Sequence, residues 1–181
     1  MTHLLVRNAS QIVTGSGPVL RGAALDTLQI HPDASLYAKD GTIVAVGPTR
    51  DVERRVTGDP EIVDAAGSAV VPGFVDSHTH AVFAGSRVEE FVDKIRGLSY
   101  QQIAEKGGGI LSTVKAVRAA GKAELKDLTR ARLQVALEHG TTSMEIKSGY
   151  GLDLENEIKM LEVIHELRAE QPIDLVATFL G

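Results

Sequence analysis

Residues 70–80, Val70-Val71-Pro72-Gly73-Phe74-Val75-Asp76-Ser77-His78-Thr79-His80, place two histidines at the end of a short apolar run that follows a Pro-Gly step. Successive strand side chains point to opposite faces, so Asp76, His78 and His80 are predicted to share one face of a buried strand. Two imidazoles on one face can bind a single ion, and imidazole nitrogen suits zinc or iron. Taken alone, the pair is more typical of hydrogen-bonded interior histidines than of a metal site.

The residues after this strand alternate between helical and strand-like periodicity. Two further strands are predicted over residues 141–147 and 173–180, and the histidines stand where parallel α/β barrels carry their chemistry. Helices connecting parallel strands give an α/β fold. The predicted helices cover 86–95, a short stretch opened by a Ser99–Gln102 capping box, 110–120, 123–138 and 153–169.

Residues 1–70 show short strand patterns instead of helices, and we predict a small antiparallel β-rich domain, the N-terminal part of a composite β-sandwich module. Leu4–Val13 is one strand, and Asp40-Gly41 between two apolar runs is typical of a type I′ hairpin. Residues 20–35 are predicted to be mainly loop. The predicted domain organisation is therefore 1–70 and 71–181.

Composition excludes several classes of function. The 181 residues carry a formal net charge of −5, which disfavours a nucleic-acid partner. The chain has no cysteine, so any metal must be held by histidine and carboxylate. It shows no membrane-spanning run and no targeting segment, and we predict a cytoplasmic protein with a small-molecule substrate.

Three motifs are similar to those of one family of hydrolases. Pro72–His80 resembles the first-strand signature of the metal-dependent amidohydrolase superfamily. The continuation Ala81–Arg87, the segment Glu145–Leu152 and the closing Ala177-Thr178-Phe179-Leu180-Gly181 narrow the resemblance to the imidazolonepropionases. The resemblance covers nearly the whole chain.

The resemblance implies the first three strand–helix units of a TIM-type (β/α)8 barrel, in a chain that is shorter than an eight-unit barrel requires. It implies that His78 and His80 bind one divalent metal ion, zinc or iron. Arg87 is expected to pair with the substrate carboxylate, and Tyr150 to hydrogen-bond substrate or product. The remaining metal ligands and the general base are expected beyond Gly181, so the 181 residues alone are expected to be inactive, and the full-length protein is expected to be a homodimer.

The implied reaction is metal-dependent hydrolysis of the cyclic amide C–N bond of 4-imidazolone-5-propionate to N-formimidoyl-L-glutamate, in histidine degradation. Two alternatives stay open at the level of sequence. One is another amidohydrolase, such as a cyclic-amidine or purine deaminase, and the other is a non-catalytic scaffold protein that retained the fold. For Arg87 the competing interpretation is a surface ion pair with Glu89 or Glu90 on its own helix.

Overall fold

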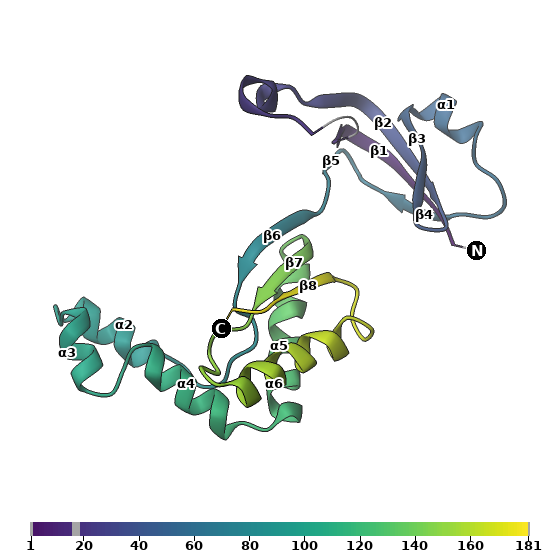
Figure 1. Cartoon of the computed structure of the whole chain (residues 1–181). Helices are drawn as coiled ribbons and strands as arrows, with labels where there is room; N and C mark the ends of the chain where they lie inside the picture. Colours follow the sequence, from purple (N-terminus) through teal and green to yellow (C-terminus); the bar gives the residue numbers. More distant parts are fainter. Residues whose placement is uncertain (1, 16–18, 181) are drawn as a thin grey trace. The chain divides into compact units, whose positions relative to one another are not determined.

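The computed structural model describes residues 2–15 and 19–180 (Figure 1). It forms two compact units, Met1–Pro72 and Gly73–Gly181. Gly73, the first residue of the second unit, packs closely on β7, because a Cβ atom there would lie 2.1 Å from Oγ1 of Thr142. Gly181, the last residue of the closing motif, lies outside the described residues.

The N-terminal unit contains one five-stranded sheet in the order β3-β2-β1-β4, with β5 also paired to β1. Its apolar side chains include the fully buried Ile12 and Tyr37. The elements are β1 His3–Thr14, a 3₁₀ helix Gly22–Asp26, β2 Gln29–Lys39, β3 Thr42–Pro48, α1 Thr49–Glu53, β4 Glu61–Asp64 and β5 Ala69–Val70.

The predicted hairpin is confirmed. β2 and β3 pair antiparallel with Lys39 opposite Thr42, and the two residues between them have positive φ angles, 49° at Asp40 and 78° at Gly41. Both central residues of a type I′ turn need this backbone conformation, and an Asp-Gly pair adopts it readily.

Two expectations for this unit need correction. The described residues of this unit form a single sheet in which β4 and β5 pair with β1 in parallel, so the sheet is mixed and not purely antiparallel. The predicted loop at 20–35 is also partly strand, since β2 begins at Gln29. Pro32 is accommodated because β2 pairs with β3 only from Ala34 onward, which leaves this end of β2 as an edge where a missing N–H is tolerated.

The C-terminal unit is built on three parallel strands in the order β6-β7-β8, which confirms the predicted strand–helix alternation (Figure 1). The strands are β6 Phe74–Thr79, β7 Thr141–Lys147 and β8 Asp174–Thr178. The helices are α2 Val88–Ile95, α3 Tyr100–Glu105, α4 Ile110–Ala119, α5 Lys122–Glu138 and α6 Leu154–Leu167. Ser99 forms the predicted capping box with Gln102 at the start of α3.

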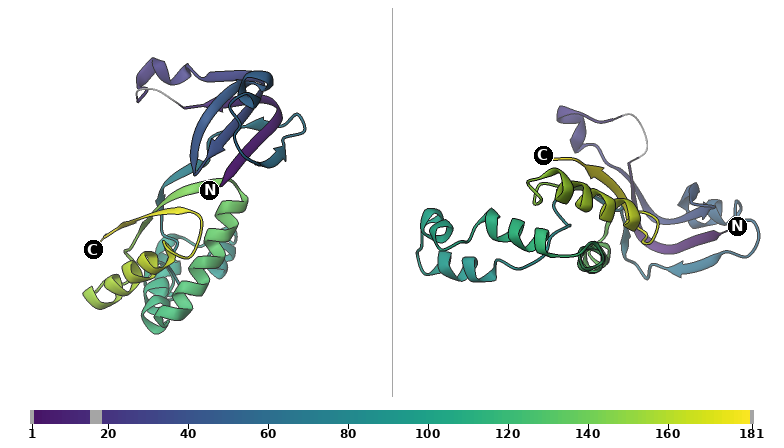
Figure 2. Two further views of the ribbon diagram at one scale, coloured as in Figure 1. Left: turned by 90° about the vertical axis from the view of Figure 1, so that its right-hand side faces the viewer. Right: turned by 60° about the horizontal axis from the view of Figure 1, so that its bottom comes forward.

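Helices α5 and α6 lie side by side against β7 and β8 (Figures 1 and 2). Their apolar faces bury Leu133, Val163 and Ile164 against Ile146 and Leu175 of the sheet. This core fixes the strand ends that carry the candidate site.

Strand β6 and helix α2 are more exposed than their patterns predict. β6 was expected to be buried, yet Phe74 is 60% and Val75 72% exposed, because among the described residues β6 pairs with β7 only. The apolar stripe of α2 is likewise exposed at Val88, Phe91 and Ile95. No helix within residues 2–15 and 19–180 combines the length and hydrophobicity that a membrane span requires.

Candidate functional site

The two histidines of the first motif lie together at the carboxyl end of β6. Their ring centroids are 5.7 Å apart in an edge-to-face arrangement, and the backbone N–H of His78 donates to Oδ1 of Asp76 at 3.1 Å. Nδ1 of His80 is buried and has no hydrogen-bond partner among the described residues. A buried polar atom normally has a partner, so this nitrogen fits a role as a ligand to a bound ion.

The described residues supply only part of a metal site. No group of three or more His, Cys, Asp or Glu side chains in residues 2–15 and 19–180 is arranged to hold an ion. Catalytic zinc sites use three protein ligands. The two histidines therefore fit a metal as a pair that needs further ligands.

A polar pair lies beside the histidines on the neighbouring strand β7. Lys147 hydrogen-bonds to Oε1 of Glu145, and the Thr178 hydroxyl donates to the same oxygen at 2.8 Å. These hydrogen bonds, from Lys147 and then Thr178, hold the pKa of Glu145 below its usual value. The carboxylate is therefore kept ionised next to the candidate metal ligands.

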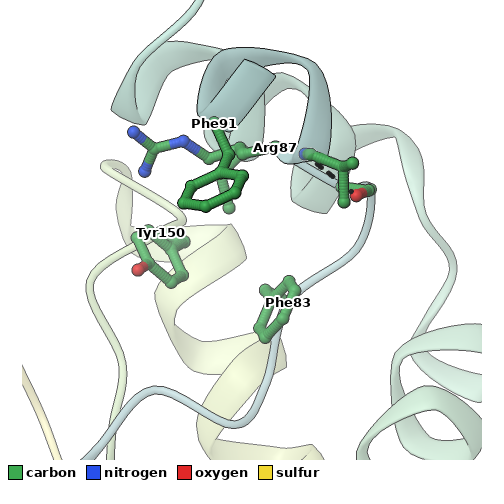
Figure 3. A pocket seen from close by; sticks show the side chains of 8 residues that line it. Phe83, Arg87, Phe91 and Tyr150 are labelled. Carbon is green, nitrogen blue, oxygen red and sulfur yellow. Dashed lines mark hydrogen bonds between the residues drawn. The ribbon is translucent and has the colours of Figure 1, made fainter. Parts of the chain in front are cut away.

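A pocket of about 400 Å³ brings together Arg87 and Tyr150, the two residues proposed to bind substrate. Figure 3 shows the Arg87 guanidinium and the Tyr150 hydroxyl extending to the same side of the view, with the rings of Phe83 and Phe91 completing the wall. The pocket thus combines aromatic faces with one cation, a surface suited to a planar, anionic small molecule. The full lining is Phe83, Gly85, Ser86, Arg87, Val88, Phe91, Thr113 and Tyr150.

Arg87 forms the ion pair with Glu90 that was the competing sequence interpretation. Its Nε and one terminal nitrogen both lie 2.9 Å from Oε2 of Glu90. The other carboxylate oxygen accepts from the backbone N–H of Gly109 at 2.8 Å and from the Ser112 hydroxyl at 3.2 Å. Burial raises the pKa of Glu90, but the hydrogen bonds from Arg87, Gly109 and Ser112 outweigh it and leave the pKa lowered.

The Glu90 pair orients Arg87 and does not remove it from the pocket. The Arg87 side chain is 38% exposed, whereas that of Glu90 is 13% exposed. Two glycines before α4 pack against other groups of the protein. Gly109 donates its backbone N–H to the Glu90 carboxylate, and a Cβ atom on Gly108 would lie 2.8 Å from Cγ2 of Ile103.

Tyr150 connects the pocket to the histidines. Its ring centroid is 5.2 Å from that of His80 and 6.4 Å from that of Phe83. His80, Tyr150 and Phe83 therefore form a continuous row of rings from the end of β6 to the pocket.

Arg132 of α5 is a supporting residue that no sequence motif identifies. Its guanidinium donates to the backbone oxygens of Ala81, at 2.9 Å, and Phe83, at 2.7 Å, and lies 3.5 Å from the centroid of the Phe83 ring. Burial lowers the pKa of Arg132. A single arginine in an amphipathic helix has no distinguishing spacing, so only the folded arrangement identifies it.

Comparison with curated proteins gives a consistent set of relatives, although no protein-family model matches the chain. The imidazolonepropionase of Symbiobacterium thermophilum is 48% identical over 180 residues, which cover 98% of this chain and 42% of that protein. The imidazolonepropionase of Halobacterium salinarum is 49% identical over 179 residues, which cover 98% of this chain and 42% of that protein. The chain spans about 42% of the length of these relatives.

Solved structures give the fold. Escherichia coli guanine deaminase matches with a TM-score of 0.61 at 15% identity, over 98% of this chain and 36% of that one. A triazine hydrolase from Arthrobacter aurescens matches with a TM-score of 0.57 at 20% identity, over 100% of this chain and 37% of that one. An atrazine chlorohydrolase from the same organism, solved as a zinc complex, matches with a TM-score of 0.54 at 18% identity over 97% and 35%. These likenesses show that the α/β unit has the fold of the first strands of an amidohydrolase barrel.

Proposed function

Because the chain belongs by sequence to the imidazolonepropionase family, we propose that the full-length polypeptide that carries it hydrolyses 4-imidazolone-5-propionate to N-formimidoyl-L-glutamate, a step of histidine degradation. The observation that carries the proposal is the contact between the His80 and Tyr150 rings, since Tyr150 also lines the pocket that holds Arg87. A candidate reaction centre and a candidate carboxylate-binding group thus belong to one continuous surface. Their partners in catalysis are proposed to come from residues other than 1–181.

His78 and His80 would hold one divalent metal ion, zinc or iron, together with further ligands that are proposed to come from residues beyond Gly181. Imidazole nitrogen suits both metals, and the unpartnered Nδ1 of His80 supports the assignment. When bound, such an ion supplies Lewis acidity and makes hydroxide available from water near neutral pH.

Arg87 is proposed to bind the propionate carboxylate of the substrate. The Glu90 pair uses Nε and one terminal nitrogen, which leaves the other terminal nitrogen as a donor toward the pocket. Because Glu90 holds the guanidinium in place, less side-chain entropy is lost when substrate binds. Carboxylate recognition by a planar guanidinium also gives orientation, which a lysine ammonium provides less well.

Tyr150 is proposed to hydrogen-bond the heterocycle or the opened product. In the reaction, a water oxygen forms a bond to the ring carbonyl carbon, the adjacent ring C–N bond breaks, and the departing nitrogen takes a proton. Tyr150 and the aromatic walls would orient the flat ring, while the group that moves the proton is proposed to lie outside this chain.

The test is product identification with a panel of substrates. The full-length polypeptide is incubated with 4-imidazolone-5-propionate, guanine and a cyclic amidine, and products are identified by mass spectrometry. We expect N-formimidoyl-glutamate as the main product. Turnover of guanine without turnover of imidazolonepropionate would support a deaminase instead, and no turnover of any substrate by a metal-replete sample would support a scaffold protein.

A further inference from the structure

The loop that carries Tyr150 is organised around a buried carboxylate. Glu157, in the first turns of α6, is 2% exposed. Its Oε2 accepts the backbone N–H of Gly149 at 2.7 Å, and its Oε1 accepts those of Gly151 at 2.7 Å and Leu152 at 2.9 Å. Three amides on both sides of Tyr150 therefore point to one side chain.

The donor set specifies an ionised carboxylate. The Gly149, Gly151 and Leu152 groups that hydrogen-bond to its oxygens are all backbone N–H donors, which a carboxylate accepts with both of its oxygens. Burial raises the pKa of Glu157, but the hydrogen bonds from Ser148, Leu152, Gly151 and Gly149 outweigh it and leave the pKa lowered. A glutamine could not reproduce this arrangement, because its amide nitrogen cannot accept an N–H.

The loop has little steric freedom to rearrange around this carboxylate. Gly149 has a φ angle of 118°, and a Cβ atom on Gly151 would lie 2.5 Å from the backbone nitrogen of Glu157. On the other side of the loop, Nε of Arg118 donates to the backbone oxygen of Gly151 at 2.8 Å and lies 3.0 Å from Oδ2 of Asp153. Donors and acceptors of the loop backbone are thus both held.

We propose that Glu157 is a positioning residue that fixes the Tyr150 ring between His80 and the pocket. Nothing in the proposed reaction requires a carboxylate at this position, and Glu157 lines no part of the Arg87 pocket. Its action is on the loop: it holds the amides on either side of Tyr150, and so sets where the phenol stands relative to His80, at 5.2 Å. The role of Tyr150 toward substrate rests on the proposed function. The clamp, by which we mean the hydrogen bonds from Gly149, Gly151 and Leu152 to Glu157, does not.

The first measurement needs no activity. Amide hydrogen exchange is followed by NMR in the full-length polypeptide and in Glu157→Gln, with Glu155→Gln, an exposed glutamate on the same helix, as the matched control. The loss of hydrogen bonds to a charged group is expected to speed exchange at Gly149, Gly151 and Leu152 by roughly 10-fold or more. Unchanged exchange at these three amides in Glu157→Gln would overturn the clamp, and the control is expected to leave them unchanged.

The second measurement is a double-mutant cycle with Tyr150→Phe on imidazolonepropionate hydrolysis. If Glu157 acts through Tyr150, removing the hydroxyl should lower kcat/KM by about 3–10-fold in the parent but by less than about 2-fold in the Glu157→Gln background, with the effect in KM more than in kcat. Additive losses would overturn positioning of Tyr150 and leave Glu157 a structural residue. If the parent does not hydrolyse imidazolonepropionate at all, the proposed function fails, and the exchange experiment still decides the clamp.

Ser148→Ala is the second variant, for use if Glu157→Gln does not fold. Ser148→Ala removes a hydroxyl that helps to lower the pKa of Glu157, and it also removes the acceptor of the Leu180 N–H at 3.0 Å. We expect the same pattern as in Glu157→Gln with a smaller amplitude. Exchange at Gly149 and Gly151 should be faster than in the parent, and the losses of kcat/KM from Ser148→Ala and Tyr150→Phe should be less than additive. Exchange indistinguishable from the parent would contradict the proposal.

Discussion

The His80 imidazole and the Tyr150 phenol lie with their ring centroids 5.2 Å apart, at the ends of the neighbouring parallel strands β6 and β7. Because the carboxyl ends of parallel strands meet at one edge of a sheet, this contact follows from the strand order. It joins a pair of candidate metal ligands to the pocket that contains the Arg87 guanidinium.

Arg87→Lys is expected to raise KM for imidazolonepropionate by roughly 10–100-fold, as the loss of a charge-assisted pairing with the substrate carboxylate would do. The kcat should change much less, since Arg87 is proposed to bind the carboxylate at a distance from the ring carbonyl. Steady-state kinetics of the full-length polypeptide checks this, with Arg130→Lys, an arginine on the surface of α5, as the control. Equal KM values in parent and Arg87→Lys would show that Arg87 serves only its ion pair with Glu90.

Glu90→Gln should affect the same parameter by a different route. The substitution leaves Arg87 intact but removes the charge that holds its guanidinium, and it weakens the acceptor of the Gly109 N–H. We expect KM to rise by about 3–10-fold, less than for Arg87→Lys, because the cation remains but is less well ordered. A larger effect than that of Arg87→Lys would mean that Glu90 itself contacts substrate.

Gly151→Ala should destabilise the protein by about 1–3 kcal/mol, the usual cost of forcing an extra methyl group into a packed site. The added Cβ would lie 2.5 Å from the backbone nitrogen of Glu157 and 2.7 Å from the carbonyl carbon of Asn156, neither of which can move without shifting α6. Gly121→Ala is the matched control, since nothing lies within 4 Å of its Cβ position and its φ angle is −71°. Denaturant unfolding measures both, and equal stabilities would contradict the close packing of the loop.

The ion pairs between α5 and α6 should make part of the stability pH-dependent. Lys126 and Lys122 hydrogen-bond to Glu166 and lower its pKa from 4.5 to about 2. A folded-state pKa below the unfolded value means that Glu166 contributes stability above pH 4.5, and that this contribution is lost as the pH falls toward about 2.

Melting temperatures of the parent and of Glu166→Gln should therefore differ above pH 5 and converge near pH 2. The difference should be small and should shrink with added salt, because the Glu166 and Lys122 side chains are exposed to solvent. A difference that is independent of pH would show that Glu166 contributes by packing and not by charge.

Local signals allowed much of this fold to be predicted from sequence. The Asp40-Gly41 hairpin, the Ser99 capping box and the strand at 141–147 depend on residues close together in the chain, and each forms as predicted. Pairing partners are not encoded locally, which is why the parallel pairing of β4 and β5 with β1 and the exposure of β6 were missed.

The residues of the candidate site could likewise be predicted from the sequence only in part. His78, His80, Arg87 and Tyr150 stand in recognisable motifs, whereas the groups that hold them do not. Arg132 and Glu157 act through backbone oxygens and amides of other segments, so no sequence spacing identifies them. A partial signal existed for Glu157, since a carboxylate in the first turns of a helix that follows a glycine-flanked loop is well placed to accept loop N–H groups.

The most direct test of the central claim is the metal content of the full-length polypeptide and its histidine variants, measured by inductively coupled plasma mass spectrometry alongside imidazolonepropionate turnover. The control is His139→Ala, because Nδ1 of His139 hydrogen-bonds to the Val135 backbone oxygen at 2.8 Å at the end of α5 and His139 is not one of the candidate ligands. We predict about one equivalent of zinc or iron in the parent and in His139→Ala. In His78→Ala and His80→Ala we predict that the metal is lost and that the activity falls by roughly 100-fold or more. Variants His78→Ala and His80→Ala that keep both the metal and the turnover would contradict the assignment of these histidines as metal ligands.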